Sequence, residues 1–122
     1  KEVIIIDDSI VRGTTLLKLV KLIRESGAKK VHVRISSPPV KYPCFYGMNF
    51  PTVEELAAGN RSEKEIQQMI DVDSLGYLSL EGTLKSTSQK KTNFCTACFS
   101  GDYPIQNKGE NDKAVSKTPS CS

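Results

Sequence analysis

Residues 2–35 read EVIIIDDSIVRGTTLLKLVKLIRESGAKKVHVRI, and this stretch decides the fold that the sequence predicts. Its opening run 2–6 is apolar and β-branched without alternation, which is typical of a strand covered on both faces in a parallel sheet. From Thr14 apolar residues follow helical spacing, and Gly27 supplies the stop. Residues 31–35 predict a second strand, so the stretch forms a βαβ unit with its ligand crevice at the carboxyl ends of the strands. The apolar positions of the predicted helix are Leu16, Leu17, Val20 and Ile23.

Shorter elements follow an irregular stretch, 38–51. The segments TVEE (52–55) and SEKE (62–65) each match the capping box of a helix start and predict two short helices. Residues 74–80 predict another strand, followed by a helical turn from Ser79. The fold class is therefore α/β, a parallel sheet with flanking helices. Buried positions in this half are expected at Leu56, Ile66, Met69 and Ile70.

Composition and charge exclude several function classes. Of 122 residues, 38% are hydrophobic and 25% charged, and the apolar runs are too short to span a bilayer. Residues 1–84 carry eleven basic and eleven acidic residues, so the globular part lacks the positive surface of a nucleic-acid-binding protein. We expect a cytoplasmic protein with no nucleic acid or membrane partner. The chain opens at Lys1 inside a strand pattern, and we expect it to be a fragment of a longer protein.

The turn after the first strand combines acceptors for a sugar with donors for a phosphate. Asp7 and Asp8 can accept hydrogen bonds from sugar hydroxyls or bind Mg2+. Gly13 allows the backbone to approach an anion, and the start of the next helix offers unpaired N–H groups. Plain helix capping by these polar residues is the alternative. The turn lacks the GxxxxGK[ST] and GxGxxG patterns, which disfavours the two nucleotide-binding classes that carry them.

Four cysteines suggest metal or redox chemistry before disulfides. Cys95 and Cys98 form a CxxC pair, which by itself is compatible with zinc, an iron-sulphur cluster or thiol redox chemistry, and buried inert thiols are a further alternative. The pair follows a polar linker rather than a strand, which disfavours the redox interpretation. Cys44 stands apart, and Cys121 lies in a polar tail.

The aromatic residues near Cys44 and the single histidine have simpler interpretations. His32 falls on the strand face opposite Val31 and Val33, so we expect a structural or packing role rather than catalysis. The aromatic residues are expected to surround a metal site formed by the cysteines and to pack the loop around Cys44. They are Tyr42, Phe45, Tyr46 and Phe50.

The segment VIIIDDSIVRGTT (3–15) resembles the phosphoribosyl pyrophosphate (PRPP) motif of type I phosphoribosyltransferases. Three later blocks are more specifically similar to amidophosphoribosyltransferases, in the same order: ISSPPVKYPCFYG (35–47), DSLGYLSLEG (73–82) and FCTACFSGDYP (94–104). The resemblance implies the C-terminal part of a type I phosphoribosyltransferase fold. It also implies an enzyme of de novo purine biosynthesis that converts PRPP and glutamine to 5-phosphoribosylamine, glutamate and pyrophosphate.

The resemblance also implies residue roles and partners. Asp7 and Asp8 would contact the ribose and help hold Mg2+, while residues 9–15 would cradle the 5′-phosphate. Three cysteines would ligate a [4Fe-4S] cluster whose fourth ligand lies outside this chain. A homo-oligomer inhibited by purine nucleotides is expected. The family's glutaminase domain is absent, so we expect no catalytic residue here and no activity from this chain alone. The candidate residues are Asp7, Asp8, Ser9, Ile10, Val11, Arg12, Gly13, Thr14 and Thr15 for PRPP, and Cys44, Cys95 and Cys98 for the cluster.

The chain is expected to divide into four regions. Residues 1–84 form the C-terminal part of the phosphoribosyltransferase domain, 85–93 a polar linker, 94–104 a cysteine-containing segment, and 105–122 a disordered tail. Two rival functions remain. A non-catalytic PRPP-binding regulator would share the turn but would have no reason to carry the cysteines. A small zinc-binding interaction module would explain the cysteines but not the turn.

Overall fold

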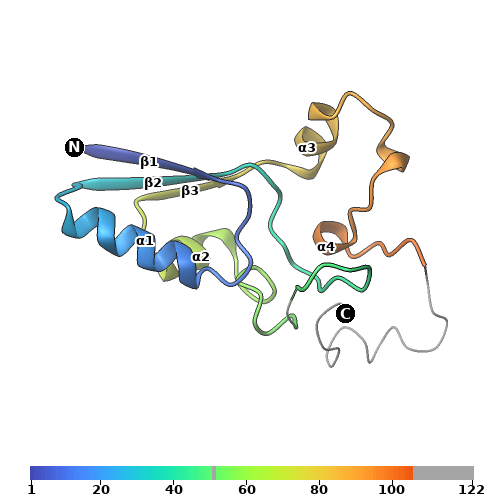
Figure 1. The fold of residues 1–122 in the computed structure, drawn as a ribbon, viewed down its shortest axis with the longest axis horizontal. Coiled ribbons are helices and arrows are strands. Elements are labelled where there is room, and N and C mark those ends of the chain that lie inside the picture. The colour runs from blue at the N-terminus through green and yellow to red at the C-terminus, as the bar shows by residue number, and fades with distance from the viewer. Residues whose placement is uncertain (51, 106–122) are drawn as a thin grey trace.

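A three-stranded parallel sheet forms the centre of the protein (Figure 1). The structure is a computed structural model that describes residues 1–50 and 52–105. Its strands are β1 (Glu2–Asp7), β2 (Lys30–Ile35) and β3 (Ser74–Tyr77), in that order across the sheet. Asp7 pairs with Ile35, and Ile35 pairs with Tyr77, so the carboxyl ends of all three strands share one edge. The predicted α/β class with a parallel sheet is confirmed.

Helices α1 (Thr14–Glu25) and α2 (Glu63–Met69) lie on one side of the sheet, as Figure 1 shows. Helices α3 (Leu80–Ser86) and α4 (Ala97–Ser100) lie beyond the carboxyl ends of the strands. Ser79 caps α3 by accepting a hydrogen bond from the N–H of Gly82 at 3.0 Å, as expected for a helix that follows this serine. None of the described helices has the length and hydrophobicity needed to cross a bilayer.

The predicted linker and tail are partly described. The first two residues of the predicted linker, 85–93, belong to the end of helix α3. Its last three residues form a 3-10 helix, η1 (Lys91–Asn93). The expected disordered tail, with Cys121, lies outside the described residues except for Ile105.

One of the two predicted capping boxes is confirmed. Ser62 Oγ accepts a hydrogen bond from the Glu65 N–H at 3.3 Å, and Glu65 Oε2 accepts one from the Ser62 N–H at 2.7 Å. The helix predicted from TVEE (52–55) is wrong, because that stretch forms successive turns. The N–H of Ala57 donates to the carbonyl of Val11 at 2.7 Å, so a long-range bond takes the donor that a helix would use internally.

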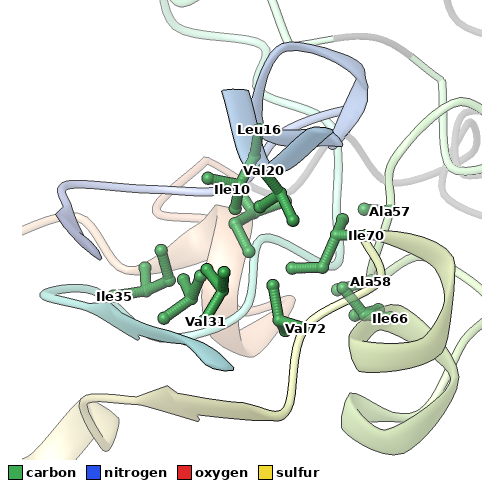
Figure 2. Packing of buried hydrophobic residues seen from close by; sticks show 11 residues of the cluster. Ile10, Leu16, Val20, Val31, Ile35, Ala57, Ala58, Ile66, Ile70 and Val72 are labelled. Atoms are coloured by element: carbon green, nitrogen blue, oxygen red, sulfur yellow. The ribbon is translucent and has the colours of Figure 1, made fainter. Parts of the chain in front are cut away.

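The core lies between the sheet and helices α1 and α2 (Figure 2). Among the apolar positions of α1, Leu16 and Val20 are buried, and Ile23 packs against the core. Leu17 is 40% exposed, because a residue next to Leu16 points about 100° away around the helix. Leu56, Ile66 and Ile70 are buried and Met69 is partly buried, in agreement with expectation. The buried cluster comprises Ile10, Leu16, Val20, Val31, Val33, Ile35, Ala57, Ala58, Ile66, Ile70 and Val72.

The prediction that β1 is covered on both faces is wrong for the described part of the chain. Ile4 is 66% exposed and Ile6 77% exposed, whereas Ile5 packs against the core. Ile4 pairs in register with His32, so the histidine lies on the same open face. Its Nδ1 lies 2.8 Å from Ser74 Oγ, which links β2 to β3 and agrees with a structural role. An unbroken apolar run cannot reveal which of its faces is covered.

Candidate functional site

The turn between β1 and α1 lines a cleft of about 340 Å3 at the carboxyl edge of the sheet. Eight of the nine predicted PRPP residues line it, and Asp8 is the exception. The structure therefore gathers these residues around one cleft where a parallel sheet usually binds its ligand. The lining residues are Asp7, Ser9, Ile10, Val11, Arg12, Gly13, Thr14, Thr15 and Leu16.

The two carboxylates are exposed at the end of β1. Asp7 Oδ1 accepts a hydrogen bond from the N–H of Asp8 at 2.9 Å, and Asp8 Oδ1 accepts one from Ser9 Oγ at 2.9 Å. These local bonds orient both carboxylates at the strand end. Exposed carboxylate oxygens can accept hydrogen bonds from sugar hydroxyls or bind Mg2+, which usually takes few protein ligands and completes its shell with water and substrate phosphates. The carboxylate pair therefore suits this ion.

Gly13 is the residue at which the turn becomes helix α1. Its φ of 82° lies in the left-handed region, and no side chain caps the helix. The alternative in which the polar residues of the turn are plain helix caps is therefore wrong. Without a side-chain cap, the first N–H groups of α1 can bind an anion. A Cβ atom at Gly13 would lie 2.7 Å from Met69 Cε, the flexible end of that side chain, so Met69 would have to move and the φ of Gly13 would be strained.

Three supports of the turn were not predicted from the sequence. Ile10 points into the core and is only 3% exposed, which anchors the middle of the turn. Next to it, the carbonyl of Val11 accepts the Ala57 hydrogen bond described above. Met69 lies beneath Gly13 from helix α2. The apolar Leu56 was the available signal for the second support, but the sequence assigns its burial to the helix predicted from residue 52.

Tyr77 ends β3 at the same edge of the sheet and was also not singled out from the sequence. Its hydroxyl is buried, and among the described residues it has no hydrogen-bond partner. Burial, with the nearby charge of Glu63, raises the pKa of Tyr77 to about 12. Deprotonation of this hydroxyl is therefore even less favourable than for an ordinary tyrosine.

The cysteines lie on two segments that contact each other. The carbonyl of Cys98 in α4 accepts hydrogen bonds from the N–H groups of Lys41 and Tyr42 at 2.9 and 3.1 Å. Cys44 Sγ accepts one from the N–H of Tyr46 at 3.3 Å within its own loop. Cys44 and Cys98 are half-buried, and Cys95 is exposed.

The predicted ligand set is not assembled as a metal site in the part of the chain that the structure describes. No three Cys, His, Asp or Glu side chains among residues 1–50 and 52–105 gather closely enough to hold a metal ion. The thiols of Cys44, Cys95 and Cys98 as they stand therefore do not fit a single-metal site. The hydrogen bonds from residues 41–42 to the Cys98 carbonyl nevertheless bring the loop that carries Cys44 next to the segment that carries Cys95 and Cys98.

Several curated proteins similar to this chain are named amidophosphoribosyltransferase. The chain is 58% identical over 105 residues to the amidophosphoribosyltransferase of Synechococcus elongatus, covering 86% of this chain and 21% of that enzyme. It is 49% identical over 106 residues to the chloroplastic amidophosphoribosyltransferase 1 of Arabidopsis thaliana, covering 87% and 19%. No protein-family model matches it.

Two solved structures agree with these relatives. Glutamine PRPP amidotransferase from B. subtilis, complexed with ADP and GMP, matches with a TM-score of 0.79 and 49% identity over 86% of this chain and 24% of that chain. A structure described as the allosteric regulatory enzyme of purine biosynthesis matches with a TM-score of 0.82 and 47% identity over 91% and 25%. The chain thus spans about a fifth of the curated relatives' length. In sequence and fold, the chain matches a segment of the amidophosphoribosyltransferases.

Proposed function

We propose that this chain supplies part of the PRPP site of an amidophosphoribosyltransferase. That enzyme converts PRPP and glutamine to 5-phosphoribosylamine, glutamate and pyrophosphate in de novo purine biosynthesis. One observation carries the proposal: the cleft at the carboxyl edge of the sheet is lined by carboxylate and hydroxyl groups beside an uncapped helix start. The identity to enzymes of this name favours it over a non-catalytic PRPP-binding regulator.

The residues divide by chemistry between the two ends of PRPP. The N–H groups at the start of α1, with the hydroxyls of Thr14 and Thr15, would donate hydrogen bonds to the 5′-phosphate. Asp7 and Asp8 would accept hydrogen bonds from the ribose hydroxyls. They would also hold Mg2+, which when bound supplies positive charge for the departing pyrophosphate.

The mechanism asks this segment for positioning rather than proton transfer. When pyrophosphate leaves, the sugar develops positive charge, and the attacking ammonia from glutamine must lie in line with the breaking bond. Holding the phosphate at Gly13 and the ribose hydroxyls at Asp7 and Asp8 fixes the sugar at two points. A nucleophile or general base from this segment is therefore unnecessary.

The first test replaces both carboxylates. In the full-length enzyme, D7N/D8N should lower kcat/KM for PRPP at least about 100-fold, because two charge-assisted contacts contribute roughly 1.5–3 kcal/mol each. The matched control is E54Q/E55Q, an adjacent exposed carboxylate pair that does not line the cleft. Near-normal kcat/KM for D7N/D8N would exclude the assignment.

For the cysteines, we propose a structural [4Fe-4S] cluster in the full-length enzyme, with Cys44, Cys95 and Cys98 as three of its four ligands. The contact between the Cys98 backbone and residues 41–42 supports the proposal, although the thiols would have to turn toward a common centre. Anaerobically purified enzyme should contain about four irons and four sulphides per chain. Stoichiometric zinc without labile sulphide would reject the cluster and leave the PRPP proposal intact.

Further proposals concern the cell and the assembly. We propose a cytoplasmic homo-oligomer that purine nucleotides inhibit. The B. subtilis relative, which is described as a complex with ADP and GMP, supports the nucleotide part. Sedimentation of the full-length enzyme with and without GMP would test both the assembly and its response to nucleotide.

A further inference from the structure

The segment that carries Cys95 and Cys98 has little internal structure to hold it in place. We call residues 94–105 the C-terminal segment and residues 41–46 the docking loop. The segment contains one helix, α4, of only four residues. A helix this short is unstable by itself, because nucleation costs more than one turn of hydrogen bonds returns. Contacts with the rest of the molecule must therefore hold the segment.

Backbone hydrogen bonds join the middle of the segment to the start of the docking loop. The carbonyl of Cys98 accepts both the Lys41 and the Tyr42 N–H bonds. Ala97, next to it, is buried with 2% exposure. Gly101 ends α4 with a φ of 80°, and a Cβ atom there would lie 3.1 Å from the Tyr42 ring. The segment thus approaches the loop so closely that a glycine is needed at this position.

Tyr103 forms the second part of the contact. Its hydroxyl donates to the carbonyl of Pro43 at 2.8 Å, and its ring centroid lies 5.0 Å from that of Phe45 and 6.2 Å from that of Tyr46. The Tyr46 hydroxyl in turn donates to the carbonyl of Ile105 and accepts from its N–H, both at 3.3 Å. Aromatic pairs at these separations stabilise beyond their buried area.

None of these contacts uses a thiol. They pair carbonyls, N–H groups, hydroxyls and aromatic rings, while the Cys44 thiol bonds within the docking loop itself. We propose that the C-terminal segment is docked independently of any metal, with Tyr103 as the positioning residue. Loss of a cluster would then leave the segment in place, and the cysteines would stand on a scaffold that exists before metal binds.

The test uses hydrogen exchange on the full-length protein after chelation of its metal under reducing conditions. The amides of Lys41 and Tyr42 report docking, because both donate to the segment. We expect them to stay protected in metal-free wild type. Y103F should speed their exchange about tenfold through loss of one hydrogen bond, and Y103A about 100-fold through loss of the ring as well. The Val33 amide, in the buried strand β2, should stay protected in every variant.

The matched control is F94A, which removes an aromatic ring of the same segment that is 39% exposed. It should leave exchange at Lys41 and Tyr42 unchanged. Unprotected amides in metal-free wild type, restored by iron and sulphide, would overturn the proposal and make the cluster the tether. If Y103A does not fold, the test rests on Y103F. Exchange at Lys41 and Tyr42 equal to that of wild type would then show that the Tyr103 hydroxyl does not hold the segment. The experiment is independent of PRPP binding and of whether the protein takes up metal at all.

Discussion

The turn after β1 (residues 8–13) and the C-terminal segment (94–105) are held in place in different ways. The turn lies between its chain neighbours β1 and α1, with Ile10 in the core and one long-range hydrogen bond from the Ala57 N–H to the Val11 carbonyl. The C-terminal segment depends on a docking loop more than fifty residues earlier in the chain, reached through carbonyls and aromatic rings. Consecutive residues between a strand and a helix can be interpreted directly from sequence. A site closed by two distant segments depends on contacts that residue spacing does not reveal.

The largest expected effect comes from breaking the turn. G13V should weaken PRPP binding about 100-fold in titration calorimetry of the full-length enzyme. The φ of 82° strains any side chain, and the Cβ would lie 2.7 Å from Met69 Cε. The matched control is G27A, where φ is 97° but nothing lies within 4 Å of the added Cβ. G27A should keep wild-type affinity, and equal losses in the two variants would attribute the effect to backbone strain alone.

A smaller effect should follow from disturbing the other region. G101A places a Cβ 3.1 Å from the Tyr42 ring at a φ of 80°, which should loosen the C-terminal segment by about 1–2 kcal/mol. Hydrogen exchange at Lys41 and Tyr42 would measure that loss. PRPP affinity should not change, because the contacts described for the C-terminal segment do not involve the turn. A parallel loss of PRPP affinity would show that the two regions are coupled.

The capping box of α2 tests how much the turn depends on its support. S62A should lower the free energy of unfolding by about 1 kcal/mol, because it removes the cap of the helix that carries Met69 beneath Gly13. Chemical denaturation would measure it. S86A, at an exposed serine ending α3, should change stability by less than about 0.5 kcal/mol. Equal losses of stability in S62A and S86A would mean that the Ser62 cap does not stabilise the fold.

The smallest effect concerns pH. The hydrogen bond from the Val31 N–H lowers the pKa of Asp73 below its usual 3.8, with help from Arg24. A lowered pKa stabilises the folded state above the unfolded pKa, and this contribution is lost as pH falls through the folded pKa. The melting temperature of the wild type should therefore fall more between pH 5 and pH 3 than that of D73N. Identical pH profiles would remove Asp73 from the acid response.

The sequence predicted the local parts of the fold better than the distant ones. The first two strands, helix α1 and the Ser62 cap depend on neighbouring residues and were predicted correctly. The helix from TVEE failed because Val11, over forty residues earlier, takes the Ala57 N–H. Likewise, no pattern in the sequence pairs the Tyr103 hydroxyl with the Pro43 carbonyl. The single covered face of β1 could not be predicted either, because three consecutive isoleucines place apolar side chains on both faces of the strand.

The central claim is that the turn after β1 holds the PRPP phosphate. A crystal structure of the full-length enzyme with PRPP and Mg2+ tests it most directly. We predict the 5′-phosphate in the cleft of about 340 Å3, within hydrogen-bond distance of the N–H groups at the start of α1, with ribose hydroxyls at Asp7 and Asp8. A fully ordered PRPP whose phosphate lies outside this cleft would contradict the account.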